Sequence, residues 1–152
     1  MAYTENLSQS LAVAADGIHA ASQSASEKLT GAVDLLKFKR VYFLIDTGTM
    51  GSSATLDFTV KASATSGGSY TAVSGSAITQ LVKATDDNKY AIVEVSSEKI
   101  LAAGSTYRYI KGSLTPGTAA CTSAVIVLGS LVNYEPASQY NATTVAQTVA
   151  LT

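Results

Sequence analysis

A stretch in the middle of the chain alternates between apolar and polar side chains over residues 54–64. The apolar positions are Leu56, Phe58, Val60 and Ala62, and the polar ones are Thr55, Asp57, Thr59, Lys61 and Ser63. Side chains of a strand point alternately to its two faces, so this period of two predicts a half-buried strand. The glycines Gly67 and Gly68 follow in a turn, and Tyr70 to Val73 then has the pattern of a short strand. Residues 54–73 are therefore expected to form a hairpin.

Two further stretches are apolar on both of their faces. Residues 40–46 are mostly β-branched and aromatic. In residues 119–128, the even-numbered positions up to Leu128 share one face, and Val125 and Val127 share the other. A strand that is covered on both sides produces such a run. Both stretches are therefore predicted to be central strands of a sheet.

Residues 77–82 and 90–95 each have the length of a strand, and they flank the polar stretch 83–89. Turn residues such as Asp86, Asp87 and Asn88 between two apolar stretches are typical of a hairpin. A second hairpin is therefore expected here.

A short helix is predicted over residues 97–104, because Ser97 can cap its N-terminus and Gly104 suits the position after its C-terminus. The chain then resumes as a strand over residues 106–114. The sequence Thr115-Pro116-Gly117 is expected to break that strand.

The two ends of the chain lack a clear pattern. Near the N-terminus, Leu7, Leu11, Ala14 and Ile18 fit a helical stripe about as well as alternating positions fit a strand, and the sequence leaves both open. Residues 133–152 show no strong pattern before Val145, and Pro136 excludes a central strand at that point. Arms of this kind either lie over their own domain or reach across to a neighbour.

Many short strands with turn signals roughly every ten residues, without regularly alternating helices, predict an all-β fold. The length of 152 residues fits one domain that can bury a core without disulfides. We expect a single antiparallel, jelly-roll-like β-sandwich over residues 31–132, with one short helical turn. Extended arms are expected over residues 1–30 and 133–152.

The charge of the chain excludes some classes of partner. Ten basic and eleven acidic residues give a formal net charge of −1, so no global field attracts a nucleic acid. Only 14 % of the residues are charged, which indicates that part of the surface is covered by another molecule. No long apolar run and no export signal are visible, so we expect synthesis in the cytoplasm and no membrane partner.

Groups that could perform chemistry are scarce. His19 is the only histidine and Cys121 the only cysteine, which excludes an intrachain disulfide and a zinc site made of these residue types. The cluster Asp86-Asp87-Asn88 has no ligand spacing for calcium and is better explained as a turn. We therefore expect neither enzymatic activity nor a cofactor.

Tyr107 and Tyr109 are two residues apart in a predicted strand, which places them on one face. Such a pair could stack on a sugar or anchor a protein interface. The rings could equally lean on the core with their hydroxyl groups in water, and the sequence leaves these alternatives open.

Seven segments carry a resemblance to a known class of proteins. They are Gly31 to Leu35, Arg40 to Phe43, Ala54 to Val60, Ser66 to Thr71, Gly75 to Leu81, Tyr107 to Tyr109, and Tyr134 to Ser138. Over roughly residues 30–140, their order resembles small structural proteins of tailed bacteriophages and prophages that are often encoded among head genes. The resemblance implies a capsid decoration or cement protein that binds the outside of an icosahedral head.

The resemblance also implies a partner and a location. The partner would be the major capsid protein, the location the capsid surface of the virion, and the form a homo-oligomer, with a trimer expected because cement proteins commonly sit at threefold positions. The residues expected to make contacts are Leu7, Leu11, Ile18, Tyr107, Tyr109, Tyr134 and Tyr140. The alternative is a carbohydrate-binding module of a virion fibre or tail, and a small hydrolase built on His19 has little support.

Overall fold

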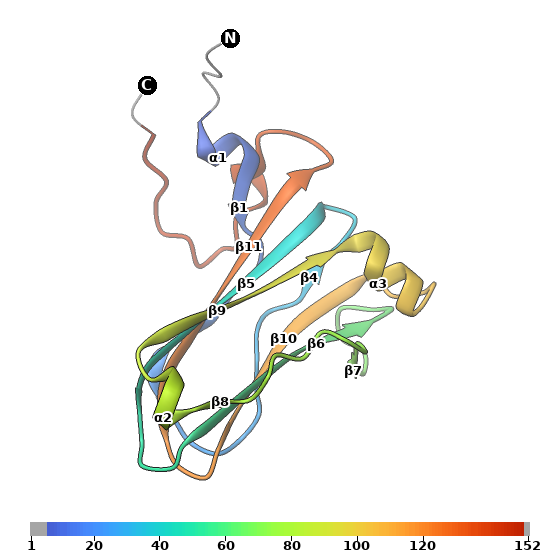
Figure 1. Ribbon diagram of the computed structural model, residues 1–152. Helices are drawn as coiled ribbons and strands as arrows, with labels where there is room; N and C mark the ends of the chain where they lie inside the picture. Colours follow the sequence, from blue (N-terminus) through green and yellow to red (C-terminus); the bar gives the residue numbers. More distant parts are fainter. Residues whose placement is uncertain (1–5, 151–152) are drawn as a thin grey trace.

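A computed structural model describes residues 6–150, which form two antiparallel β-sheets packed face to face (Figure 1). The predicted all-β antiparallel sandwich is therefore confirmed. Residues 1–5 and 151–152, which belong to the two predicted arms, lie outside the described residues. Among residues 6–150, no helix has the length and apolar content needed to cross a lipid bilayer.

The first sheet, sheet A, has the strand order β1-β11-β5-β9, and β2 also pairs with β11. Its strands are β1 (Leu11–Val13), β2 (Ile18–Gln23), β5 (Phe38–Met50), β9 (Lys89–Ser96) and β11 (Cys121–Val132). The two stretches that are apolar on both faces lie in β5 and β11. Both are central strands, as predicted.

The second sheet, sheet B, has the order β3-β10-β6-β7, with β4 also on β10 and β8 also on β6. Its strands are β3 (Lys28–Leu29), β4 (Val33–Asp34), β6 (Thr55–Ser63), β7 (Thr71–Ala72), β8 (Leu81–Val82) and β10 (Tyr109–Gly117). The predicted hairpin of residues 54–73 is confirmed, because β7 pairs with β6.

The core lies between the sheets. Phe43 of β5 and Phe58 of β6 meet across it with ring centroids 5.4 Å apart, and both side chains are almost fully buried. Gly112 of β10 leaves space for these two rings, since a Cβ there would lie 2.8 Å from Phe58 and 3.0 Å from Phe43. The alternation of residues 54–64 thus predicts correctly which side of β6 faces inward.

The described helices are short: α1 (Leu7–Ser10), α2 (Lys83–Asp86), α3 (Ser97–Ala103) and the 3-10 helix η1 (Ala137–Tyr140). The predicted helix at residues 97–104 is confirmed as α3. The N-cap of α3 is Ser96, one residue before the predicted cap Ser97. The Ser96 side chain accepts a hydrogen bond from the backbone N–H of Lys99. Gly104 follows α3 with extended backbone, and the ring of Tyr107 packs where a side chain would project.

The second predicted hairpin is wrong. β8 pairs with β6 in sheet B, whereas β9 pairs with β5 in sheet A. The stretch between them crosses from one sheet to the other at the end of the sandwich. The hydroxyl of Thr47 fixes this crossing, because it lies 2.8 Å from the carbonyl oxygen of Asp86 and accepts from the N–H of Lys89 at 3.0 Å.

The predicted break at residues 115–117 is also wrong. β10 continues through Pro116, which is paired with Leu56 of β6. β3 pairs with β10 only as far as Leu114, so Pro116 occupies an edge position, where proline is tolerated in a strand.

The terminal regions differ in how they join the body. Residues 11–29 contribute β1, β2 and β3 to the two sheets and therefore lie over their own domain. At the other end, η1 packs against the body through Ala137, which is buried. Beyond Asn141 the chain continues to residue 150 without a strand and is mostly exposed.

Candidate interaction surface

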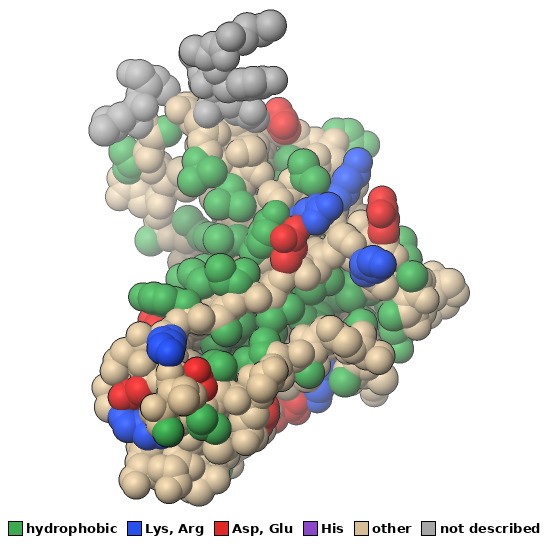
Figure 2. All heavy atoms as spheres, in the orientation of Figure 1, with side chains coloured by type: hydrophobic (Ala, Val, Ile, Leu, Met, Phe, Trp, Pro, Cys, Tyr) green, Lys and Arg blue, Asp and Glu red, His purple; other side chains and the backbone are tan. Residues whose placement is uncertain are grey.

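The outward side of sheet A is apolar. Outward residues of neighbouring strands stand opposite one another, with Ile126 beside Leu44 and Leu44 beside Ile92. We call this surface the A face and define it by Val13, Tyr42, Leu44, Tyr90, Ile92, Ile126 and Leu128. Figure 2 shows apolar side chains gathered over β11, β5 and β9.

Several residues of the A face are open to solvent. The exposed fraction is 46 % for Ile126, 68 % for Ile92 and 69 % for Tyr90. The neighbouring Tyr42 and Leu44 are half-buried. β5 and β11 are thus central within their sheet. Residues of α1 and residues 145–149 border the A face at Leu128, whereas Ile92 and Ile126 stay open to solvent.

Three charged residues share the register of this face, namely Arg40, Asp46 and Glu94, and two of them pair. Arg40 Nη1 lies 2.5 Å from Glu94 Oε1, and this contact with Glu94 raises the pKa of Arg40. Both side chains are partly exposed. A partner that covers the A face would therefore desolvate mainly apolar surface.

The outward side of sheet B has the opposite character. We call it the B face and define it by Thr55, Asp57, Thr59, Lys61, Ser113 and Thr115. Its polar groups bond to one another: Glu27 Oε1 lies 2.5 Å from Lys61 Nζ and accepts from the Ser113 hydroxyl at 2.5 Å. The bond from Lys61 and then that from Ser113 lower the pKa of Glu27. This face is adapted to water.

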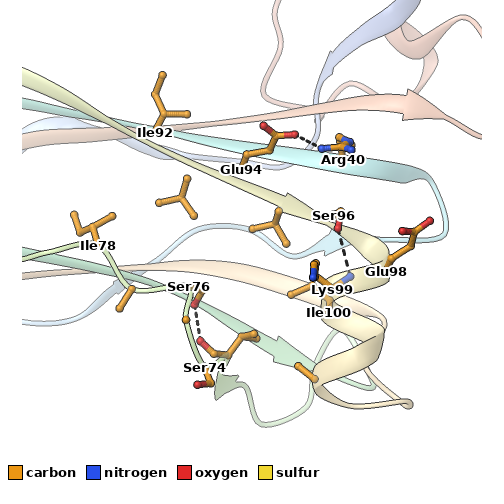
Figure 3. Close-up of a pocket in the computed structure, with 16 residues that line it drawn as sticks. Arg40, Ser74, Ser76, Ile78, Ile92, Glu94, Ser96, Glu98, Lys99 and Ile100 are labelled. Atoms are coloured by element: carbon orange, nitrogen blue, oxygen red, sulfur yellow. Dashed lines mark hydrogen bonds and ion pairs between the residues drawn. The ribbon is translucent and has the colours of Figure 1, made fainter.

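A cleft of about 800 Å³, the β9 cleft, opens between β9 of sheet A and residues 73–78 beside sheet B. Figure 3 shows Ile78 on one wall, Ile100 of α3 at one end, and Arg40 with Glu94 at the rim. Val93 and Val95 of β9 also line it. The cleft therefore combines an apolar floor with a polar rim, to which Ser74, Ser76 and Lys99 also contribute.

The predicted contact residues near the N-terminus separate into two groups. Leu7 is 71 % exposed and Leu11 is half-buried, and they line a hollow with Val13 and Leu128 of the A face. The structure thus brings these two leucines to the edge of the A face. Ile18 lies in the core, with only 9 % of its surface exposed.

The predicted contact tyrosines near the C-terminus also differ from each other. Tyr134 is 76 % exposed in the loop after β11. Tyr140 is half-buried and meets Phe38 edge-on, with ring centroids 5.9 Å apart. Tyr134 is therefore accessible to a partner, whereas Tyr140 helps to hold η1 on the body.

Tyr107 and Tyr109 have different surroundings. Tyr107 precedes β10, and its half-buried ring packs against the core and beside Gly104. Tyr109 begins β10, and the guanidinium carbon of Arg108 lies 4.9 Å from its ring centroid. The two rings therefore do not present one shared stacking surface.

The titratable groups singled out in the sequence have structural or solvated surroundings. The His19 side chain is 84 % exposed and lies 3.5 Å from Asp16. Cys121 is buried, and this burial raises the pKa of its thiol. The backbone N–H of Val82 donates to Asp86 and lowers the pKa of that carboxyl group. The Lys83 side chain and then the backbone N–H of Met50 donate to Asp87 and lower its pKa. In the described part of the chain, no three His, Cys, Asp or Glu side chains gather as a metal site would require.

Sequence reasoning missed Tyr90 and Ile92. A usable signal was present, because residues 90–95 are apolar at both odd and even positions, as are residues 40–46. The β9 cleft had no such signal, since it joins segments from two sheets that were expected to form one hairpin. A scan of protein-family models finds none that matches the chain, and a search of curated proteins finds no match.

Proposed function

We propose that the protein is a virion structural protein, a capsid decoration or cement protein that binds the outer surface of an icosahedral phage head. The A face is the observation that carries this proposal. A contiguous apolar surface of this kind, opposite the polar B face, marks a protein interaction site. The resemblance of residues 30–140 to small phage head proteins indicates the partner, the major capsid protein.

The physical basis of the proposal is multivalent contact. A shell fails where its subunits separate, so a protein that touches several subunits adds contacts that must break together. A rigid sandwich with one low-charge apolar face meets this requirement. We propose a trimer as the bound form, and the role needs no catalysis, cofactor, nucleic acid or membrane.

Co-sedimentation with heads that lack the protein tests the proposal. The heads would come from the phage or prophage that encodes this chain, with its gene deleted. Ile126→Lys and Leu44→Lys each place a charge in the A face and should weaken binding at least about tenfold, since a buried unpaired charge is costly. Thr115→Lys adds the same charge to the B face and should bind like the wild type.

Circular dichroism and thermal unfolding would establish that the three variants are folded. The proposal fails if the wild-type protein does not bind the heads. It also fails if the folded Ile126→Lys and Leu44→Lys variants bind as well as Thr115→Lys.

A carbohydrate-binding role on a fibre or tail has weaker support, because the rings of Tyr107 and Tyr109 do not form a shared platform. A glycan array should show no selectivity for any sugar. Selective binding that is lost in Tyr109→Ala would favour that role over the one proposed.

A further inference from the structure

The lateral edges of the two sheets are unequal. In sheet B, both edges consist of strands of two residues each, namely β3 with β4 and β7 with β8. In sheet A, one edge is β1 with β2, which are separated by residues 14–17. Short and interrupted edge strands are a common protection against pairing with other chains.

β9 forms the remaining edge and lacks this protection. It runs for eight residues without interruption, and Glu94 is the only charged residue between Tyr90 and Val95. Within residues 6–150, β9 pairs with no strand other than β5. Its second edge therefore offers a row of backbone N–H and C=O groups to another extended segment.

The β9 cleft lies directly beside this open edge. Val73 and Ile78 form its far wall, and their N–H groups donate to Val60 and Phe58 of β6, at 2.9 and 3.0 Å. That wall is thus fixed to sheet B, while Val93 and Val95 belong to sheet A. A strand added to β9 would cover the apolar residues between the two walls (Figure 3).

The chain itself contains a segment with the properties of such a strand. Residues 136–152 carry no charge. In an extended strand, Val145 and Val149 would share one side with Gln147, and the smaller side chains of Ala146 and Thr148 would share the other. The side with the two valines would be the more apolar one. We call residues 142–150 the C-terminal arm. It forms no strand in the structure. Val145 is half-buried and Val149 is 70 % exposed, and both line a hollow with Leu7, Val13 and Leu128 of the same copy, which the arm would leave on binding elsewhere.

The arm begins at the β1 edge of sheet A, whereas the β9 cleft of the same copy lies at the opposite edge. Asn141 Oδ1 accepts from the N–H of Val13 at 2.9 Å, and the N–H of Ala142 donates to the carbonyl of Val13 at 2.8 Å. β1 and β9 are opposite edges of a path of four strands, about 14 Å apart at the usual strand spacing. At about 3.3 Å per residue, the first four or five arm residues would be spent on crossing, so Val145 could not reach the cleft of its own copy. Residues 145–149 indeed lie beside Leu7 and Ser8 of α1, away from the β9 cleft (Figure 1).

We infer that the open edge of β9 binds the C-terminal arm of a second copy of this chain as an added strand of sheet A, with Val145 and Val149 in the β9 cleft. Backbone hydrogen bonds would supply the affinity, and the cleft would select the side chains. The contact joins the β1 side of one copy to the β9 side of the next. Such a head-to-tail contact generates a ring where its rotation closes. The inference does not depend on the capsid role proposed above, because it concerns contacts between copies in the absence of heads.

Sedimentation velocity on three full-length proteins tests the inference. The wild type should associate, and Val149→Lys should shift to the mass of a single copy, with at least about tenfold weaker self-association. Ala146→Lys is the matched control, because it adds the same charge to the other side of the arm, and it should associate like the wild type. A wild type that sediments as a single copy would overturn the inference, as would Val149→Lys that assembles like the wild type.

Disulfide trapping locates the seat of the arm. One protein carries Ile92→Cys on the outward side of β9, and a second carries Ala146→Cys, Thr148→Cys or Ala150→Cys in the arm. The native Cys121 is buried, so the introduced thiols are the accessible ones. Mild oxidation of the mixture should give a disulfide between the two proteins at one or more arm positions. If no mixed disulfide forms at any of them, β9 is not the seat, and the inference is wrong.

Discussion

The outward faces of the two sheets differ in polarity. The B face follows the ordinary pattern of an antiparallel sheet with one side in water, and its Lys61, Glu27 and Ser113 side chains bond to one another. The A face carries Leu44, Ile92 and Ile126 in one cross-strand row. The difference teaches that a strand can be apolar on both sides while only its inner side is fully covered, since Ile92 and Ile126 on the outer side stay exposed.

The largest expected effect on stability is a difference between substitutions on the two sides of β5. Phe43→Ala removes a fully buried ring from the core and should lower the free energy of unfolding by about 3–5 kcal/mol. Leu44→Ala, the next residue, removes a half-buried side chain from the A face and should cost only about 1 kcal/mol. Urea unfolding in the Val149→Lys background, which is expected to keep the protein as a single copy, measures both. Equal losses would mean that the A face is already covered within one copy.

A smaller effect is expected on the inner side of sheet B. Gly112→Ala places a methyl group 2.8 Å from the ring of Phe58, so the two core rings must shift. Overpacking of this kind typically costs about 1–3 kcal/mol. Gly67→Ala is the control, since a Cβ there meets no atom within 4 Å. Thermal unfolding should show a clear loss for the first variant only; similar behaviour of both would contradict the packing described here.

Exchanging side chains between the two outward faces should change stability little. Ile126→Thr and Thr115→Val each keep a β-branched residue at a strand surface, and each should alter the free energy of unfolding by about 0.5 kcal/mol or less. Fluorescence of a dye that binds apolar surfaces should fall in Ile126→Thr and rise or stay constant in Thr115→Val. An unchanged signal in Ile126→Thr would show that the A face is not the exposed apolar surface in solution.

The smallest expected effect concerns how stability depends on pH. Arg108 makes two hydrogen bonds to Asp34, at 2.9 and 2.7 Å, and they hold the pKa of Asp34 below its usual value of 3.8. A lowered folded-state pKa stabilises the protein fully above that usual value, and the contribution is lost as the pH falls through the folded value. Asp34→Asn should therefore be less stable than the wild type near neutral pH, and the difference should disappear in strong acid. A difference that persists in acid would assign the effect to packing.

Short-range sequence patterns predicted the features that depend on side-chain alternation within one strand. The alternation of residues 54–64 predicts β6 and its inner side, and the two-sided runs predict that β5 and β11 are central. The hairpin at residues 77–95 failed because Asp and Asn favour a turn equally well when it crosses between sheets. β1, β2 and β3 have only two to six residues each, and their conformation depends on pairing with β10 and β11, which no local pattern encodes.

The candidate surface was predictable in part. Leu7 and Leu11 were expected to make contacts, and the structure places them at the edge of the A face. Ile18 fitted the same stripe, yet its side chain turns into the core because β2 pairs with β11. The β9 cleft could not be predicted, since it forms only when residues 73–78 and β9 are placed in different sheets.

Electron microscopy of the intact particle tests the central claim most directly. We predict density for this sandwich on the outer surface of the head, with Leu44 and Ile126 against the shell and the B face toward solvent. A sandwich on the tail or a fibre, or one on the head with its A face in solvent, would contradict the account.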